Sequence, residues 1–235
     1  MAELLIELFS EEIPAGLQAQ AAENLKKLMT NGIADAGLTY ASAAAFHTPR
    51  RLTLVVEGLL EASPTVQEER KGPKVGAPDQ AIKGFLRGAG LTVDDLKVRD
   101  DKKGQVYFAK ITKPSRLATE IVAEVLEATI RNFPWPKSMR WGSGSLRWVR
   151  PLQSILCLLS NEVETQIVPL KIDGMSAGNT TRGHRFMADD VFTVNDFDDY
   201  EAKLKRAKVI LRCDERSAAI WQEATNQAFA LGLDV

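Results

Sequence analysis

The residues best suited to chemistry are the cations and tryptophans between residues 131 and 150. This window holds five Lys and Arg residues and three of the four tryptophans, and no acidic residue occurs from 128 to 161. Cations neutralise phosphates and indole rings stack on bases, so the window favours contact with a nucleic acid or a partner protein. The alternative is a tryptophan-anchored loop with solvated arginines, because aromatic residues pack more often than they recognise ligands. The predicted contact residues here are Lys137, Arg140, Arg147 and Arg150.

Two further basic turns carry donors suited to a phosphate backbone. One runs from His47 to Arg51 and is extended by cations near residues 70–74, and the other runs from Asn179 to Phe186. Guanidinium groups make charge-assisted hydrogen bonds to phosphates, but the same groups pair equally well with nearby carboxylates in a structural turn. The predicted contact residues in these turns are Arg50, Arg51, Arg182 and Arg185.

Signatures of catalysis are mostly absent from the sequence. There is no phosphate-binding GxxxxGK[ST] loop, no GxGxxG turn and no GxSxG nucleophile elbow. Neither histidine has ligands at metal-binding spacing, so we predict no metal site and no catalytic residue. Glu7, Glu11 and Glu12 lie close enough in sequence for acid–base chemistry, although a solvated strand end explains them more simply.

Apolar periodicity indicates the elements that must position these residues. Strands are expected at 3–9, 40–46, 52–56, 105–112, 153–159, 166–172 and 208–211. Helices are expected to begin at Pro14, Asp79, Ser115, Asn195 and Glu215. Because strands and helices alternate without a regular βαβ rhythm, we predict an α+β fold with mixed, largely antiparallel sheets and packed helices.

Composition points to an ordinary globular protein. The 235 residues are 45% hydrophobic and 26% charged with a net charge of −1, which excludes disordered, collagen-like and supercharged classes. With so small a net charge, an anionic partner must be met by a local patch. The two cysteines, Cys157 and Cys213, fit reduced, buried thiols of a cytoplasmic protein.

The predicted organisation has two α+β subdomains. Residues 1–133 form the first, with a Pro- and Gly-rich linker at 61–78, and residues 134–235 form the second.

Seven short motifs occur in order along the chain: ELFSEEIPA at 7–15, TPRRL at 48–52, AIKGF at 81–85, FPWPKSMRWG at 133–142, RWVRP at 147–151, GHRF at 183–186 and DER at 214–216. Each motif is weak alone, but seven in register across the chain are specific. Together they resemble the N-terminal part of the β subunit of bacterial heterotetrameric glycyl-tRNA synthetase. One departure is Phe9-Ser10, where many relatives are expected to carry Gly-Thr.

This resemblance implies an α₂β₂ ligase that joins glycine to tRNA(Gly) using ATP, with adenylate chemistry in the α subunit. The chain is then expected to bind tRNA(Gly) and the α subunit, to contact no membrane and to hold no cofactor, while ATP and Mg²⁺ bind at the α subunit. Later β-subunit domains would lie beyond Val235, so we expect the chain to be truncated there. Two alternatives stay open: a stand-alone RNA-binding module without a synthetase partner, and a region that serves mainly as the α–β interface.

Overall fold

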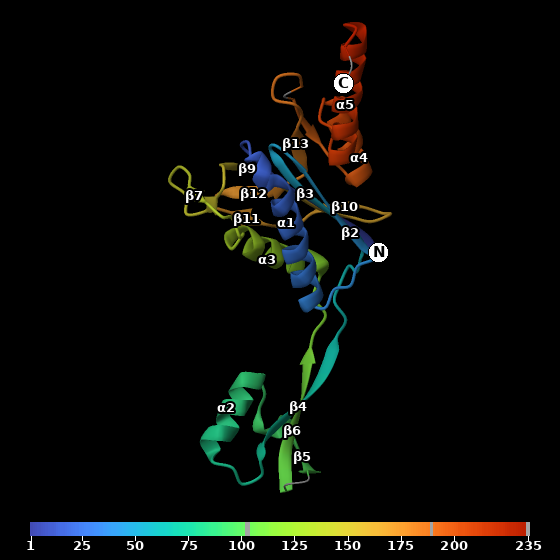
Figure 1. Cartoon of the computed structure of the whole chain (residues 1–235). Coiled ribbons are helices and arrows are strands. Elements are labelled where there is room, and N and C mark those ends of the chain that lie inside the picture. Colours follow the sequence, from blue (N-terminus) through green and yellow to red (C-terminus); the bar gives the residue numbers. More distant parts are fainter. Residues whose placement is uncertain (102–103, 189, 234–235) are drawn as a thin grey trace. The chain divides into compact units, whose positions relative to one another are not determined.

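A computed structural model describes residues 1–101, 104–188 and 190–233 (Figure 1). The chain folds into two compact units: a main unit of residues 1–62 and 117–235, and an inserted unit of residues 63–116. The elements of the main unit are β1 Ala2–Ser10, α1 Ala15–Asp35, β2 Ser42–Thr48, β3 Arg51–Leu59, α3 Ala118–Arg131, β7 Met139–Arg140, β8 Arg147–Trp148, β9 Leu152–Ser160, β10 Thr165–Ile167, β11 Lys171–Ile172, β12 Met175–Gly178, β13 Thr180–Arg182, β14 Val191–Thr193, α4 Phe197–Arg206 and α5 Cys213–Ala230. Those of the inserted unit are β4 Val66–Lys74, α2 Asp79–Ala89, the 3₁₀ turn Val93–Asp95, β5 Leu96–Asp101 and β6 Gly104–Lys113.

The main unit is built on one mixed, largely antiparallel sheet. Its strand order is β11-β12-β9-β1-β3-β2, and β10 adds to β9. The central strand β1 pairs antiparallel with both β3 and β9. Only the pairing of β12 with β9 is parallel among the strands of the described residues. The predicted α+β class is therefore confirmed.

Both faces of β1 are buried, which explains why apolar residues occupy both faces of the strand, with Glu7 as a polar residue among them. Leu4, Ile6 and Leu8 belong to the core that α1 and α3 cover. Leu5 points to the opposite face, where it belongs to a second cluster with Tyr200 of α4. The sheet is thus sandwiched between α1 and α3 on one side and α4 on the other (Figure 1).

The inserted unit is a three-stranded antiparallel sheet in the order β4-β6-β5, with α2 on one face. The predicted linker at 61–78 contains β4, which pairs with β6 from Val66↔Lys113 to Lys74↔Val106. The linker assignment was therefore wrong over residues 66–74, because a charged strand without apolar alternation carries no local strand signal. The contacts divide the chain into a main unit made of two separate segments and one continuous inserted unit, whereas the predicted division falls at residue 133/134.

Other local differences concern short or unpaired segments. Residues 208–211 follow α4 without forming the predicted strand, whereas β12 and β13 form between residues 175 and 182, where no strand is predicted. Cys157 is buried as expected, and burial raises the pKa of its thiol, but Cys213 is exposed.

Among the described residues, no helix is both long and apolar enough to cross a membrane.

Candidate nucleic-acid interface

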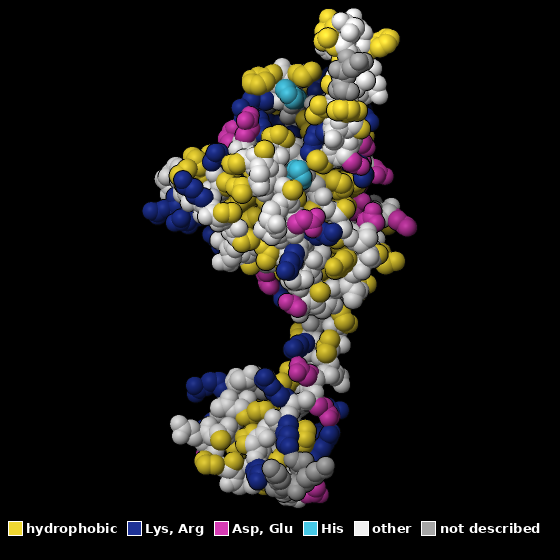
Figure 2. Space-filling model, viewed as in Figure 1, with side chains coloured by type: hydrophobic (Ala, Val, Ile, Leu, Met, Phe, Trp, Pro, Cys, Tyr) yellow, Lys and Arg dark blue, Asp and Glu magenta, His cyan; other side chains and the backbone are white. Residues whose placement is uncertain are grey.

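The predicted basic window forms a small hairpin, β7–β8, on the main unit. Arg140 pairs directly with Arg147 across the two strands, and both side chains are exposed, as is Lys137. Like charges facing each other across a ladder repel, so this pair lowers stability slightly and raises the local positive potential. Within the described parts of the chain, no carboxylate lies within ion-pair distance of Lys137, Arg140 or Arg147. Figure 2 shows dark blue side chains gathered at this edge of the main unit.

The tryptophans of the hairpin are packed inward rather than presented to solvent. Trp148 is 1% exposed, and its ring centroid lies 5.0 Å from those of both Phe133 and Trp135. Trp141 donates its indole N–H to the Trp148 carbonyl at 3.1 Å. The aromatic side chains therefore anchor the hairpin, as the alternative interpretation of the window anticipated, while the cations remain on its surface.

A carboxylate on a neighbouring turn fixes the loop between the two hairpin strands. Asp173 accepts hydrogen bonds from the backbone N–H groups of Ser145 and Leu146, each at 3.1 Å. These backbone hydrogen bonds lower the pKa of Asp173, so it stays ionised. The hairpin is thus held at its base by rings and at its loop by hydrogen bonds.

Arg150 lies apart from the three exposed cations. It is half-buried and donates to the Val149 carbonyl at 3.0 Å. Lys137, Arg140 and Arg147 are therefore the exposed cations of this region, whereas Arg150 lies between β8 and β9.

The other predicted turns meet at the end of β1, and one of their arginines is buried. Arg51 is 3% exposed and pairs with the fully buried Glu7, Nε to Oε2, at 3.0 Å. Glu7 also accepts hydrogen bonds from Thr181 at 2.6 Å and from Tyr200 at 2.5 Å. Arg51 donates another of its N–H groups to the Arg182 carbonyl. Arg51 thus has no exposed guanidinium to offer, and we replace its predicted contact role with a structural one.

Tyr200 makes this buried network sensitive to alkali. Burial, and secondarily the neighbouring Glu7 charge, raise the pKa of Tyr200 well above its usual value. An unfolded tyrosine ionises near pH 10 whereas the folded one does not, so stability is intact below about pH 10 and is lost as the pH rises beyond it. We expect an additional loss of up to about 1.4 kcal/mol per pH unit. The free energy of unfolding, measured from pH 9 to 11, should decline less steeply for Tyr200→Phe than for the wild type. The control Tyr40→Phe, at an exposed position, should keep the wild-type slope. Equal slopes for all three proteins would contradict this prediction.

Of the remaining arginines of the two turns, Arg50 and Arg185 are half-buried beside paired carboxylates. Arg50 contacts Glu11 at 3.4 Å, and Arg185 pairs with both Glu11 and Glu12. Arg182 is exposed on β13. Because Glu7, Glu11 and Glu12 are each engaged by a guanidinium, their arrangement is that of an anchoring network. We therefore assign them a structural role rather than an acid–base role.

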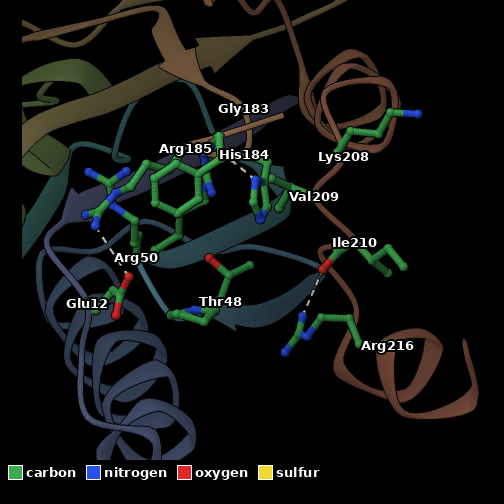
Figure 3. Close-up of a pocket in the computed structure, with 13 residues that line it drawn as sticks. Glu12, Thr48, Arg50, Gly183, His184, Arg185, Lys208, Val209, Ile210 and Arg216 are labelled. Atoms are coloured by element: carbon green, nitrogen blue, oxygen red, sulfur yellow. Dashed lines mark hydrogen bonds and ion pairs between the residues drawn. The ribbon is translucent and has the colours of Figure 1, made fainter. Parts of the chain in front are cut away.

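A cavity of about 230 Å³ separates the two basic turns (Figure 3). Its wall includes Thr48 and Arg50 from one turn, and Gly183 and Arg185 from the other. A Cβ at Gly183 would lie 2.1 Å from the Ala188 carbonyl oxygen, so only glycine fits where the second turn packs against its own backbone. Arg216 bounds the cavity from α5 and is held by the carbonyls of residues 210 and 211. Three of the predicted arginines, Arg50, Arg51 and Arg185, thus line one cavity. The sequence pattern does not predict this cavity.

The structure therefore places the eight predicted residues in two groups on the main unit. Within the described residues, no group of three His, Cys, Asp or Glu side chains is arranged to hold a metal ion. The hairpin group combines exposed cations with packed aromatic rings, whereas the group at the end of β1 combines arginines with paired carboxylates.

Comparison with known proteins defines the family. A sequence model described as "Glycyl-tRNA synthetase beta subunit" matches residues 4–235. The chain belongs to this family. Among its relatives, the glycine--tRNA ligase beta subunit of Ruegeria sp. (strain TM1040) is 70% identical over all 235 residues, which are 34% of that protein. The proteins of the same name from Cereibacter sphaeroides (strain ATCC 17023) and Paracoccus denitrificans (strain Pd 1222) are 67% and 66% identical over the same full length, again 34% of each.

The resemblance drawn from seven motifs is thereby confirmed. The chain spans about a third of the length of the curated glycyl-tRNA synthetase beta subunits it matches. Its fold, its cationic hairpin and its buried arginine network are consequently features of one part of such a subunit.

Proposed function

We propose that the chain is part of the β subunit of a cytoplasmic glycine--tRNA ligase. In this role it supports the ATP-dependent attachment of glycine to tRNA(Gly), with the chemistry performed by a catalytic α subunit in an α₂β₂ assembly. Family membership over residues 4–235 is the observation that carries this proposal. The alternative of a stand-alone RNA-binding module has no support among the relatives, which are named ligase beta subunits.

The β7–β8 hairpin is the contact surface that we assign to tRNA. Lys137, Arg140 and Arg147 are exposed, and none of the ion pairs of the described residues engages them. Such cations release condensed counterions when they meet phosphates, which favours binding at low salt. The packed rings beneath them hold the hairpin in place, so little side-chain and backbone freedom is lost on binding.

Within this role, residues of the chain bind and orient RNA and leave bond formation to the partner. ATP and Mg²⁺ belong to the α subunit in this proposal, and no step of the reaction is assigned to this chain. Arg50 and Arg185 line the cavity between the two basic turns, where they present polar groups at the end of the main sheet. We propose that these two arginines support the contact of the chain with tRNA or with the α subunit.

Replacing Arg140 and Arg147 with alanine should weaken binding of the chain to a tRNA(Gly) transcript. The linear dependence of log K on log salt should become shallower by about one unit for each phosphate that is no longer neutralised. Fluorescence anisotropy across a range of about 50–200 mM salt measures both effects. The control is Lys205→Ala/Arg206→Ala, which removes the same charge from exposed positions on α4 and should change little.

The same variants separate RNA contact from subunit contact. If Arg140→Ala/Arg147→Ala binds tRNA like the wild type at every salt concentration, the hairpin is not the RNA surface. Reduced co-purification with the α subunit, with unchanged tRNA binding, would assign the hairpin to the α–β interface instead.

A further inference from the structure

The inserted unit has a charge that the composition of the whole chain conceals. Residues 63–116 contain twelve Lys and Arg against seven Asp and Glu, a net charge of +5. The rest of the chain has eighteen cations against twenty-four acids, a net charge of −6. A compact unit of 54 residues with this imbalance attracts polyanions even though the whole chain is almost neutral.

Strand register places much of this charge on one face of the sheet. Residues directly opposite one another across a ladder share a face. Lys71 of β4 lies opposite Phe108 of β6, and Phe108 lies opposite Lys97 of β5. Lys110 follows Phe108 by two residues and lies on the same face, as does Arg99 after Lys97. This surface, hereafter the cationic sheet face, is defined by Lys71, Lys97, Arg99, Phe108 and Lys110.

Arg99 lies at the centre of the cationic sheet face, where a ring and a carboxylate both contact it. The Arg99 guanidinium lies over the Phe108 ring, 5.1 Å from its centroid, and makes two hydrogen bonds of 2.8 Å to Glu69. These bonds lower the pKa of Glu69, so both partners remain charged. Arg99 therefore ties the two outer strands together above Phe108. Lys71 and Lys97 flank this bridge about 10 Å apart, which is two inter-strand spacings.

Helix α2 occupies the opposite face and leaves this one open within the unit. A Cβ at Gly72, next to Lys71, would lie 2.9 Å from the Phe85 ring of α2. Since neighbouring residues in a strand point to opposite faces, Lys71 faces away from α2. Lys71, Lys97, Arg99 and Lys110 are all exposed, and Figure 2 shows dark blue side chains on the inserted unit.

We propose that the cationic sheet face binds the phosphate backbone of RNA. The net charge of +5 on the inserted unit and the exposed cations of this face favour contact with the phosphates of a sugar-phosphate strand. The Arg99 guanidinium plane, supported from below by the Phe108 ring, supplies a surface on which an exposed base can stack. The inference rests on the proposed function in one respect, namely that the RNA is tRNA(Gly).

The test uses the complete 235-residue chain and a fluorescein-labelled tRNA(Gly) transcript. Lys71→Gln/Lys97→Gln should lower affinity about tenfold and reduce the salt slope by about one unit for each phosphate that is no longer neutralised. The matched control, Lys83→Gln/Arg87→Gln, removes two exposed cations from α2 in the same unit and should stay within about twofold of the wild type. Equal decreases in affinity for both variants would show that only the net charge of the unit matters, and this result would overturn the proposal.

Lysine footprinting gives an independent readout without substitution. In the wild-type chain, bound tRNA should reduce acetylation of Lys71, Lys97 and Lys110 several-fold, as quantified by mass spectrometry, while Lys83 on α2 stays reactive. If bound tRNA leaves the acetylation of all three lysines unchanged, the proposal is overturned.

Failure of this inference is distinguishable from failure of the proposed function. If the wild-type chain binds tRNA and Arg140→Ala/Arg147→Ala weakens binding, but Lys71→Gln/Lys97→Gln does not, only the cationic sheet face is rejected. If the wild-type chain fails to bind the transcript at low salt, RNA contact by this chain is rejected together with the cationic sheet face.

Discussion

Arg51→Met is expected to lower the free energy of unfolding by about 3–5 kcal/mol, because it leaves a buried carboxylate without its counter-charge. Glu7 is 0% exposed and Arg51 is 3% exposed, so water cannot replace the missing guanidinium. The substitution also removes the hydrogen bond to the Arg182 carbonyl, which joins β3 to β13. Denaturant unfolding of the purified chain measures the decrease in stability.

A second substitution tests whether the uncompensated charge is the cause. Adding Glu7→Gln to Arg51→Met removes the charge while keeping a polar group for Tyr200 and Thr181. The double variant should therefore be more stable than Arg51→Met alone, and the two sites should show strong coupling in a double-mutant cycle. A stability for Arg51→Met within about 1 kcal/mol of the wild type would contradict the assigned role.

An exposed ion pair provides the matched control. Arg131 pairs with Glu127 one helical turn earlier at 2.8 Å, and both side chains are more than two-fifths exposed. Solvent screens such a pair, so Arg131→Met should cost only about 0.5 kcal/mol. The contrast would show that burial, rather than the mere presence of an ion pair, makes Arg51 important.

Trp148→Ala is expected to cost about 3–5 kcal/mol, since it empties a buried site against two aromatic rings. Trp148 is the anchor of the β7–β8 hairpin, through ring contacts with Phe133 and Trp135. Removal of this anchor should also weaken tRNA binding by the cations on the same hairpin. Thermal unfolding and tRNA titration on one preparation measure both effects.

Trp148→Phe tests whether aromatic packing accounts for most of the stability that Trp148 contributes. The indole N–H of Trp148 is buried and has no hydrogen-bond partner among the described residues. Phenylalanine therefore keeps the aromatic packing without sacrificing a hydrogen bond and should cost less than half as much as alanine.

Trp221 on α5 is the control for tryptophan removal. It is 64% exposed, so Trp221→Ala should stay within about 0.5 kcal/mol of the wild type. A decrease in stability at Trp221 as large as the decrease at Trp148 would argue against the anchor. So would a stable Trp148→Ala variant that binds tRNA normally.

The sequence alone determined the features that depend on residues close together in the chain. The apolar run of β1 and the periodic apolar stripe of α1 predicted both elements, because strand and helix periods are local properties. The acid-free window with its tryptophans predicted a cationic loop region, which folds as the β7–β8 hairpin, and seven short motifs identified the family. These inferences needed only residue types and spacings.

Tertiary structure alone decided which distant residues meet. Residues 66–74 resemble a charged linker, yet they form β4 because β6, which follows much later in the sequence, supplies the hydrogen-bonding partner. Arg51 resembles a surface cation, but Glu7 lies 44 residues away in sequence and pairs with it in the interior. The net charge of the inserted unit likewise depends on boundaries that only packing defines. Local patterns specify elements, whereas burial, charge pairing and unit boundaries arise from contacts between residues that are distant in sequence.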